Sequence, residues 1–297
     1  MIGRFKKDWP FHLIILPSVI LTFIFSYMPI YGIIMAFQDF NPGLGFFHSQ
    51  WVGLENFKLV FGQQQFINTI FNTLFISIFK IAIGTFSSVV FALLLNEVNS
   101  TFSKRFFQTI VYIPNFISWV IMAGILLNIL ATDGFINIIL GIFGMGPIQF
   151  ISNQNIFPWT IILTDVWKTF GFGTVVYLAA ITSIDPELYE SAIIDGAGRW
   201  KQTLYVTVPL LVPIIILMVV LALGNVLNAG FDQVYNLYSP VVYPKGDIMD
   251  TYVYRVGLQN GKYAIGTAVG LFKSVISCAL ISLSLYIAYK VADYKVF

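Results

Sequence analysis

Residues 208–230 read VPLLVPIIILMVVLALGNVLNAG and contain no charged side chain. About 20 helical residues cross the roughly 30 Å hydrocarbon core of a bilayer, so this stretch is long enough to span a membrane. A helix in lipid satisfies its own backbone hydrogen bonds and can be apolar on every side. The stretch therefore predicts a transmembrane helix.

The whole chain shares this apolar character. Of its 297 residues, 58% are hydrophobic and only 10% are charged, and the mean hydropathy is +0.82. A water-soluble domain of this length needs a more polar surface. Five further windows are long enough to span a bilayer: 12–37, 68–95, 107–130, 157–181 and 264–289. We therefore predict an all-α protein with six transmembrane helices that pack as one domain over residues 1–297.

Proline and cysteine refine this picture. Pro17, Pro29 and Pro114 fall inside predicted spans and should kink them, which frees carbonyls that neighbouring helices must satisfy. The single cysteine, Cys278, excludes an internal disulfide.

The distribution of Lys and Arg predicts the orientation, because cytoplasmic loops of membrane proteins retain these residues. With the N-terminus inside, nine of them lie on the inner side: Arg4, Lys6, Lys7, Lys104, Arg105, Arg199, Lys201, Lys290 and Lys295. Only four lie outside: Lys58, Lys245, Arg255 and Lys262. We expect a multi-pass protein of the bacterial cytoplasmic membrane with both termini in the cytoplasm.

The connector before the fifth span is longer and more ordered than a turn requires. Asp185 can cap a helix that has Pro186 at its first position and Glu187 in its first turn. Gly196 and Gly198 then break this helix, and a second segment leads to Pro209 and Pro213 at the start of the fifth span. The pattern predicts a two-part element over residues 185–213, and a helix resting on lipid headgroups is the alternative.

This element resembles a family motif. Glu190-Ser191-Ala192, Gly196, Val206, Val208 and Pro209 match the Glu-Ala-Ala, three residues, Gly, nine residues, Ile-x-Leu-Pro signature of permease subunits of binding-protein-dependent ABC importers. Ser191, Val206 and Val208 replace the usual Ala, Ile and Leu, with small changes of bulk and unchanged spacing. The chain is therefore similar to the permeases of type I importers.

In that family the loop is the coupling helix, which docks in a groove of the ATP-binding subunit. The resemblance implies that the residues contacting the ATPase lie in the same stretch of this chain: Pro186, Glu187, Leu188, Glu190, Ser191, Ala192, Asp195, Gly196 and Pro209. It also implies a second homologous permease, two ATP-binding subunits that hold ATP and Mg, and an extracellular or periplasmic solute-binding protein.

A second resemblance concerns the cargo. Residues 51–57, WVGLENF, look like the segment before the second span of carbohydrate permeases. Residues 31–42, 91–97 and 228–235 resemble the subfamily that handles oligosaccharides released from polysaccharides. The resemblance implies a carbohydrate substrate.

Four charged side chains fall within predicted spans, where each costs roughly 2.5–3.5 kcal/mol at the helix centre: Lys80, Asp165, Lys168 and Lys273. Asp165 and Lys168 are three residues apart and can pair on one helix. Lys80 continues a polar stripe with Thr73 and Ser77 that should face the bundle interior. In the sixth span, Gly266 and Gly270 form a possible close-packing pair.

These groups either line a wet path for substrate or form ion pairs that fix helix packing. Ion pairing is the better explanation for Asp165 with Lys168, and a polar cavity is slightly better for Lys80 and Lys273. The path candidates are Lys80, Trp119, Lys168, Asn225, Asn228 and Lys273.

The sequence contains no catalytic or metal-binding pattern. His12 and His48 are far apart, and no nucleotide-binding Gly-Lys-Ser/Thr loop is present. We therefore expect a non-catalytic subunit without a cofactor of its own or nucleic-acid partner. An ion-coupled secondary transporter or channel is the main alternative, but such folds have matching broken helices in two halves, and no such pair is evident here.

Overall fold

The structure is a computed structural model that describes residues 2–292, and the side chains of residue 9 and residues 11–290. The chain forms two compact units, Met1–Gln63 with Val253–Phe272 and Gln64–Tyr252 with Lys273–Phe297. Lys295, which the charge distribution places inside, lies outside the described residues, as do the side chains of Arg4, Lys6 and Lys7.

The first unit begins with a long helical segment. The α-helix α1 (Ile2–Thr22) passes into the π-helical η1 (Phe23–Tyr27) and the 3-10 helix η2 (Met28–Phe37), whose first turn contains Pro29. The apolar part, Phe11–Phe37, is long enough to cross a membrane. A short antiparallel hairpin follows, with β1 (Gln38–Asp39) paired to β2 (Gln50–Trp51) around α2 (Gly45–His48), and then α3 (Glu55–Phe61).

A buried amide holds this hairpin region together. The side chain of Asn56 donates to the backbone carbonyls of Ala36, at 3.0 Å, and Gln38, at 2.9 Å. Asn56 belongs to the WVGLENF segment, so one role of this segment is to fix the chain after the first span.

The same unit contains η5 (Val253–Gln259) and the start of α15 (Tyr263–Ala292). A Cβ on Gly266 would lie 2.7 Å from the Cα of Gly257, whereas one on Gly270 would meet no described atom within 4 Å. Close packing is confirmed for Gly266, against Gly257 of the preceding segment, but not for Gly270, so the two glycines do not act as the predicted pair among the described residues.

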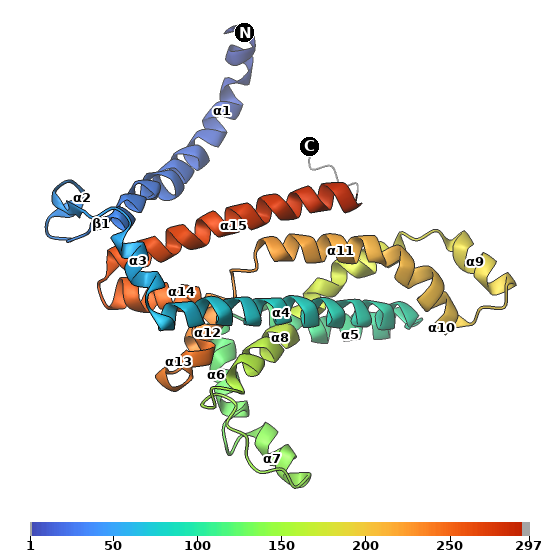
Figure 1. Cartoon of the computed structure of the whole chain (residues 1–297). Coiled ribbons are helices and arrows are strands. Elements are labelled where there is room, and N and C mark those ends of the chain that lie inside the picture. The colour runs from blue at the N-terminus through green and yellow to red at the C-terminus, as the bar shows by residue number, and fades with distance from the viewer. Residues whose placement is uncertain (1, 293–297) are drawn as a thin grey trace. The chain divides into compact units, whose positions relative to one another are not determined.

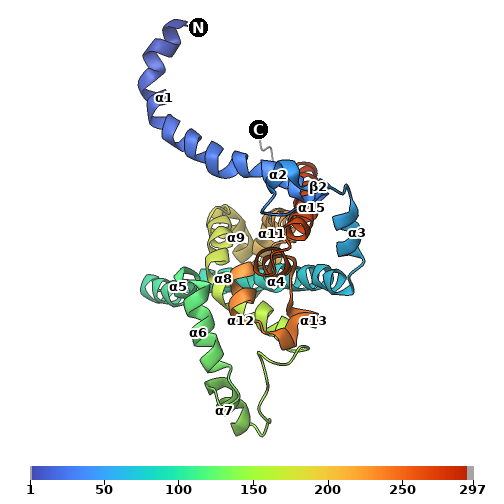
Figure 2. The ribbon, with the colours of Figure 1, turned by 90° about the vertical axis from the view of Figure 1, so that its left-hand side faces the viewer.

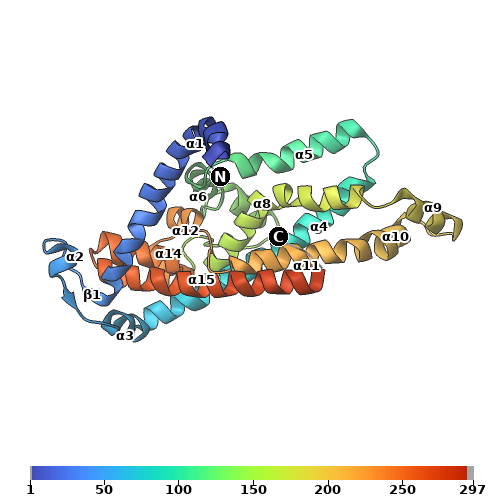
Figure 3. The same ribbon diagram turned by 90° about the horizontal axis from the view of Figure 1, so that it is seen from above.

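The second unit is built on α4 (Gln64–Glu97) and α8 (Phe157–Thr182), which lie against each other. Buried Ile76, Ile161 and Val166 belong to its main apolar core. Figures 1 and 3 show α5 (Thr101–Phe116) and α11 (Val208–Gly224) running alongside these helices. Figure 2 shows α6 (Trp119–Ile129) and α7 (Phe135–Ile142) leading away from them.

Short elements complete this unit. They are α9 (Pro186–Ile194), α10 (Arg199–Gln202), the π-helical η3 (Thr203–Thr207), α12 (Phe231–Leu237), η4 (Pro240–Val242), α13 (Tyr243–Gly246) and α14 (Met249–Tyr252).

Over the described residues, five helices are long and apolar enough to cross a membrane, or six if α5 and α6 form one broken span. The predicted all-α membrane fold is confirmed. The third span differs from the prediction of one kinked helix, because α5 and α6 meet at 104°. Pro114 lies in the last turn of α5, and Ser118 starts α6 by accepting from the Ile121 amide.

The fifth span also differs from its predicted limits of 208–230. Its helix begins at Arg199 and ends at Gly224. Residues 225–230 leave the helix, and Gly230 has a φ of +95°. Val226, Leu227 and Ala229 of this segment are buried, and their apolar side chains extend the predicted span because composition does not separate a buried loop from a helix.

Candidate functional site

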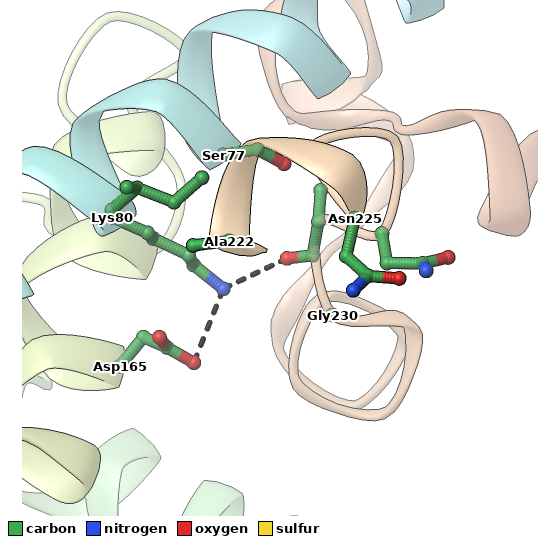
Figure 4. A pocket seen from close by; sticks show the side chains of 9 residues that line it. Ser77, Lys80, Asp165, Ala222, Asn225 and Gly230 are labelled. Atoms are coloured by element: carbon green, nitrogen blue, oxygen red, sulfur yellow. Dashed lines mark hydrogen bonds and ion pairs between the residues drawn. The ribbon is translucent and has the colours of Figure 1, made fainter. Parts of the chain in front are cut away.

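A polar cavity of about 310 Å³ lies where the fifth span breaks. It is lined by Ser77 and Lys80 of α4, Asp165 of α8, and Asn225 and Asn228 of the segment between α11 and α12. Figure 4 shows the Lys80 ammonium between Asp165 and the segment that carries Asn225 and Gly230. Helices that are otherwise apolar therefore place amide, ammonium and carboxylate groups around one space.

The Lys80 ammonium contacts three oxygen atoms. It lies 3.2 Å from Asp165 Oδ1, and it donates to the Ala229 carbonyl at 2.8 Å and to Gln233 Oε1 at 2.5 Å. The Lys80 side chain is only 10% exposed. The partner of Asp165 is therefore Lys80, and the sequence prediction of a pair with Lys168 is wrong.

Lys273 forms a second polar group beside the same segment. Its ammonium lies 2.5 Å from Asp250 Oδ1 and 2.7 Å from Asn228 Oδ1. Asn228 also lines the cavity, so Lys273 holds one wall residue in position. Three of the path candidates, Lys80, Asn225 and Asn228, thus share one cavity, and Lys273 contacts its edge.

Lys168 and Trp119 lie at another place, the break between α5 and α6. Lys168 is buried, and its ammonium donates to the Asn115 carbonyl at 2.9 Å and lies 5.3 Å above the Trp119 ring. The carbonyl of Asn115 lies at the end of α5, where helical partners run out. Lys168 thus satisfies a carbonyl at the helix end, whereas the amide missing at Pro114 frees the carbonyl of Ile110. The expectation for the carbonyl freed by Pro114 stays a prediction, as does a path role for Lys168 and Trp119.

The predicted polar stripe of α4 faces the interior. Thr73 and Ser77 are buried, and Thr73 Oγ1 accepts from the Met249 amide at 2.9 Å. Gln233 and Asp250, which face Lys80 and Lys273, were not among the predicted site residues. Both follow the fifth span in a polar segment, and no local spacing connects them to residues of α4 or α15.

The two-part element before the fifth span has the predicted local structure. The Asp185 carboxylate accepts from the Glu187 amide at 3.0 Å, and Pro186 occupies the first turn of α9. Gly196 ends the helix with a φ of +76°, and the amide of Ala197 donates to the Ala192 carbonyl at 2.8 Å. A left-handed residue after the last turn is a common helix ending, and glycine adopts this conformation without steric strain.

The outer surface of α9 is open to solvent. Glu190 and Ser191 are exposed and Ala192 is partly exposed. Large apolar side chains are also exposed, with Leu188 at 45% and Ile193 at 60%. Figures 1 and 3 show α9 beyond the ends of α4 and α8. A short helix with exposed apolar and acidic groups is typical of a docking surface.

Hydrogen bonds inside the element connect α9 to the start of the fifth span. Tyr189 and Thr207 share a hydrogen bond of 2.9 Å between their hydroxyl oxygens, and Thr207 is buried. Gln202 Nε2 donates to the Ala197 carbonyl at 2.8 Å across the bend. The helix that carries Pro209 and the cavity residue Ala222 is therefore tied directly to α9.

Comparison with known proteins agrees with this arrangement. Residues 81–296 match the family described as binding-protein-dependent transport system inner membrane component. The chain belongs to this family. It is therefore an inner-membrane component of an importer that works with a separate binding protein, and the ion-coupled alternative has no support.

Individual relatives align with nearly the whole of this chain. The polygalacturonan/rhamnogalacturonan transport system permease protein YteP of Bacillus subtilis is 40% identical, over 95% of this chain and 88% of that protein. A permease chain in a bacterial ABC transporter involved in the import of the acidic polysaccharide alginate is 37% identical, with a TM-score of 0.88 over 97% of this chain and 98% of that one. Another structure shows the alginate transporter with a periplasmic protein bound to an alginate pentasaccharide, at 36% identity and a TM-score of 0.88 over 99% of both chains.

Proposed function

We propose that this chain is the permease subunit of an ATP-driven importer for oligosaccharides. The observation that carries the proposal is the polar cavity around Lys80, Asp165, Asn225 and Asn228. Hydroxyl groups of a sugar both donate and accept hydrogen bonds, and amides, ammonium groups and carboxylates supply both kinds of partner. The sugars named for the relatives support a carbohydrate cargo.

The importer that we propose contains a second, homologous permease, two ATP-binding subunits and an extracellular or periplasmic solute-binding protein. One permease supplies only part of the wall of a path, because the cavity is not enclosed. ATP and Mg are bound by the ATP-binding subunits, and the present chain supplies no catalytic group. Both termini lie in the cytoplasm in this proposal.

The segment 185–213 is the coupling element in this proposal. Glu187, Leu188, Glu190, Ser191 and Ala192 present the docking surface, and Gly196 allows the turn. Movement of α9 reaches the fifth span through the Tyr189–Thr207 hydrogen bond and the continuous helix from Arg199 to Gly224. Closure of the ATPase pair then changes the walls of the cavity, since Ala222 and Asn225 lie at the far end of this helix.

The function is tested in proteoliposomes that contain both permeases and the ATPase, with the binding protein outside. We expect uptake to require ATP and a binding protein loaded with an oligosaccharide, and acidic and neutral oligosaccharides are compared. Uptake that continues without ATP when a sodium or proton gradient is applied would refute the proposal.

The docking surface is tested separately with Ala192→Arg. This variant places a long cation on the partly exposed face of α9. We expect the ATPase to be lost on purification, whereas Thr101→Arg, at the exposed first residue of α5, leaves it bound. Equal recovery of ATPase with both variants would place the docking surface elsewhere.

A further inference from the structure

Three oxygen atoms from three separate elements surround the Lys80 ammonium. They are Oδ1 of Asp165 on α8, the carbonyl oxygen of Ala229 before α12, and Oε1 of Gln233 on α12. A lysine ammonium has three N–H donors. The number of acceptors equals the number of donors, so the charge is fully coordinated.

The amide oxygen faces the ammonium for reasons independent of Lys80. Gln233 is fully buried, and its Nε2 donates to the Ile161 carbonyl at 2.8 Å and to Thr164 Oγ1 at 2.9 Å. Both of its donors are used on α8, so its oxygen must point the other way.

The backbone oxygen is also placed by the fold. The fifth helix ends at Gly224 and α12 starts at Phe231, so the carbonyl of buried Ala229 lies outside both helices. Gly230 follows with a φ of +95°, and a Cβ there would lie 3.1 Å from Lys80 Nζ. The glycine is therefore needed both for the backbone turn and for the space that the ammonium occupies.

Backbone carbonyls at helix breaks coordinate small monovalent cations in membrane transporters, and carboxylate and amide oxygens are ligands of hard cations in general. We propose that this oxygen cage, made by Asp165, Ala229 and Gln233, is a monovalent-cation site whose permanent occupant is the ammonium of Lys80. A cation that is covalently attached cannot exchange with the solution. The helix break is therefore held in the same way at any sodium or potassium concentration, and the site cannot draw energy from an ion gradient.

The other two lysines in the spans have different surroundings. Lys273 contacts one carboxylate and one amide oxygen, and Asn228 is exposed. Lys168 donates to a single backbone carbonyl, and no carboxylate of the described residues lies within 4.0 Å of it. Lys168 is therefore the matched control, a buried lysine without a cage.

The test is to remove the attached cation and supply a free one. In Lys80→Ala the missing group corresponds to n-propylammonium, which can enter through the adjoining cavity of about 310 Å³. We measure the melting temperature of the assembled permease–ATPase complex as n-propylammonium is added, and this readout requires no carbohydrate. We expect the alanine variant to melt below the wild type and to recover by more than about 2 °C when the amine binds the folded state.

Four controls make the result specific to the cage. Lys80→Met fills the space and Lys168→Ala removes a lysine that has no cage, so neither variant should respond to the amine. Tetramethylammonium has the same charge but no N–H donor, so it should not restore Lys80→Ala. Addition of Asp165→Asn to Lys80→Ala removes the negative ligand and should abolish the response.

The proposal is overturned if n-propylammonium leaves Lys80→Ala unchanged, or if it raises the melting temperature of the methionine and double variants equally. Failure to obtain the Lys80→Ala complex even with the amine present during expression and purification also contradicts it, because the free cation should replace the attached one.

Discussion

The hydrogen bond between Tyr189 and Thr207 is the most direct connection between α9 and the fifth span, and Tyr189→Phe removes only its phenolic oxygen. The ring remains, so the packing of α9 is kept. Thr207 is 3% exposed and loses its side-chain partner on α9. We expect α9 to dock on the ATPase as before and to transmit its movement to the fifth span less well.

The size of the effect follows from the strength of one partly buried hydrogen bond. Such a bond contributes about 1 kcal/mol, which changes an equilibrium constant about fivefold at 25 °C. Suppose that the bond forms only in the state in which movement of α9 is passed on to the fifth span. Loss of the bond then lowers the population of that state by at most about fivefold. We therefore expect up to about five times more ATP to be hydrolysed per sugar imported.

The assay is the ratio of ATP hydrolysis to uptake in proteoliposomes, measured with a loaded binding protein. Tyr205→Phe is the matched control, because Tyr205 lies two residues before Thr207 and is 76% exposed. The amount of ATPase that co-purifies is measured for both variants, which separates docking from transmission. An unchanged ratio for Tyr189→Phe with unchanged docking would refute the role of this hydrogen bond.

Three further substitutions test local features of the fold, each through the melting temperature of the purified complex. Gly171→Ala should lower the free energy of unfolding by about 1–3 kcal/mol, because its Cβ would clash with the Val111 carbonyl oxygen. Gly124→Ala is the control: its Cβ meets no described atom within 4 Å, so this variant should be neutral or stabilising. Gly196→Ala should lower the free energy of unfolding by about 1–2 kcal/mol through backbone strain alone, because residue 196 is left-handed and its Cβ meets no described atom within 4 Å. An unchanged melting temperature would show that the turn adapts. Asn56→Ala should lower the free energy of unfolding by about 1–3 kcal/mol, because two backbone carbonyls lose their donor. A smaller decrease would mean that water replaces the amide.

Local chemistry explains why α9 could be predicted so closely. The cap at Asp185, the proline in the first turn and the left-handed glycine at 196 each act within a few residues of the backbone. The fourth span likewise matches its prediction closely, since 157–181 became Phe157–Thr182. Length and apolarity are enough to predict the limits of a helix that simply crosses the bilayer.

The same local reasoning failed where partners come from distant elements. Asp165 and Lys168 are close in sequence, but α8 turns Asp165 toward Lys80 of α4 and Lys168 toward the end of α5. The 104° break after Pro114 is another example, because proline predicts a kink but gives neither its size nor the new direction.

The sequence by itself determined that the chain has membrane-spanning helices and a capped short helix before the fifth span, because hydrophobic length and helix-end chemistry are local properties. Only the tertiary structure decided which oxygen atoms surround each buried lysine. A charge in a membrane protein takes its partners from whichever elements lie beside it, and these are set by helix packing and by the place where the fifth span breaks. The oxygen cage around Lys80 is a product of that packing.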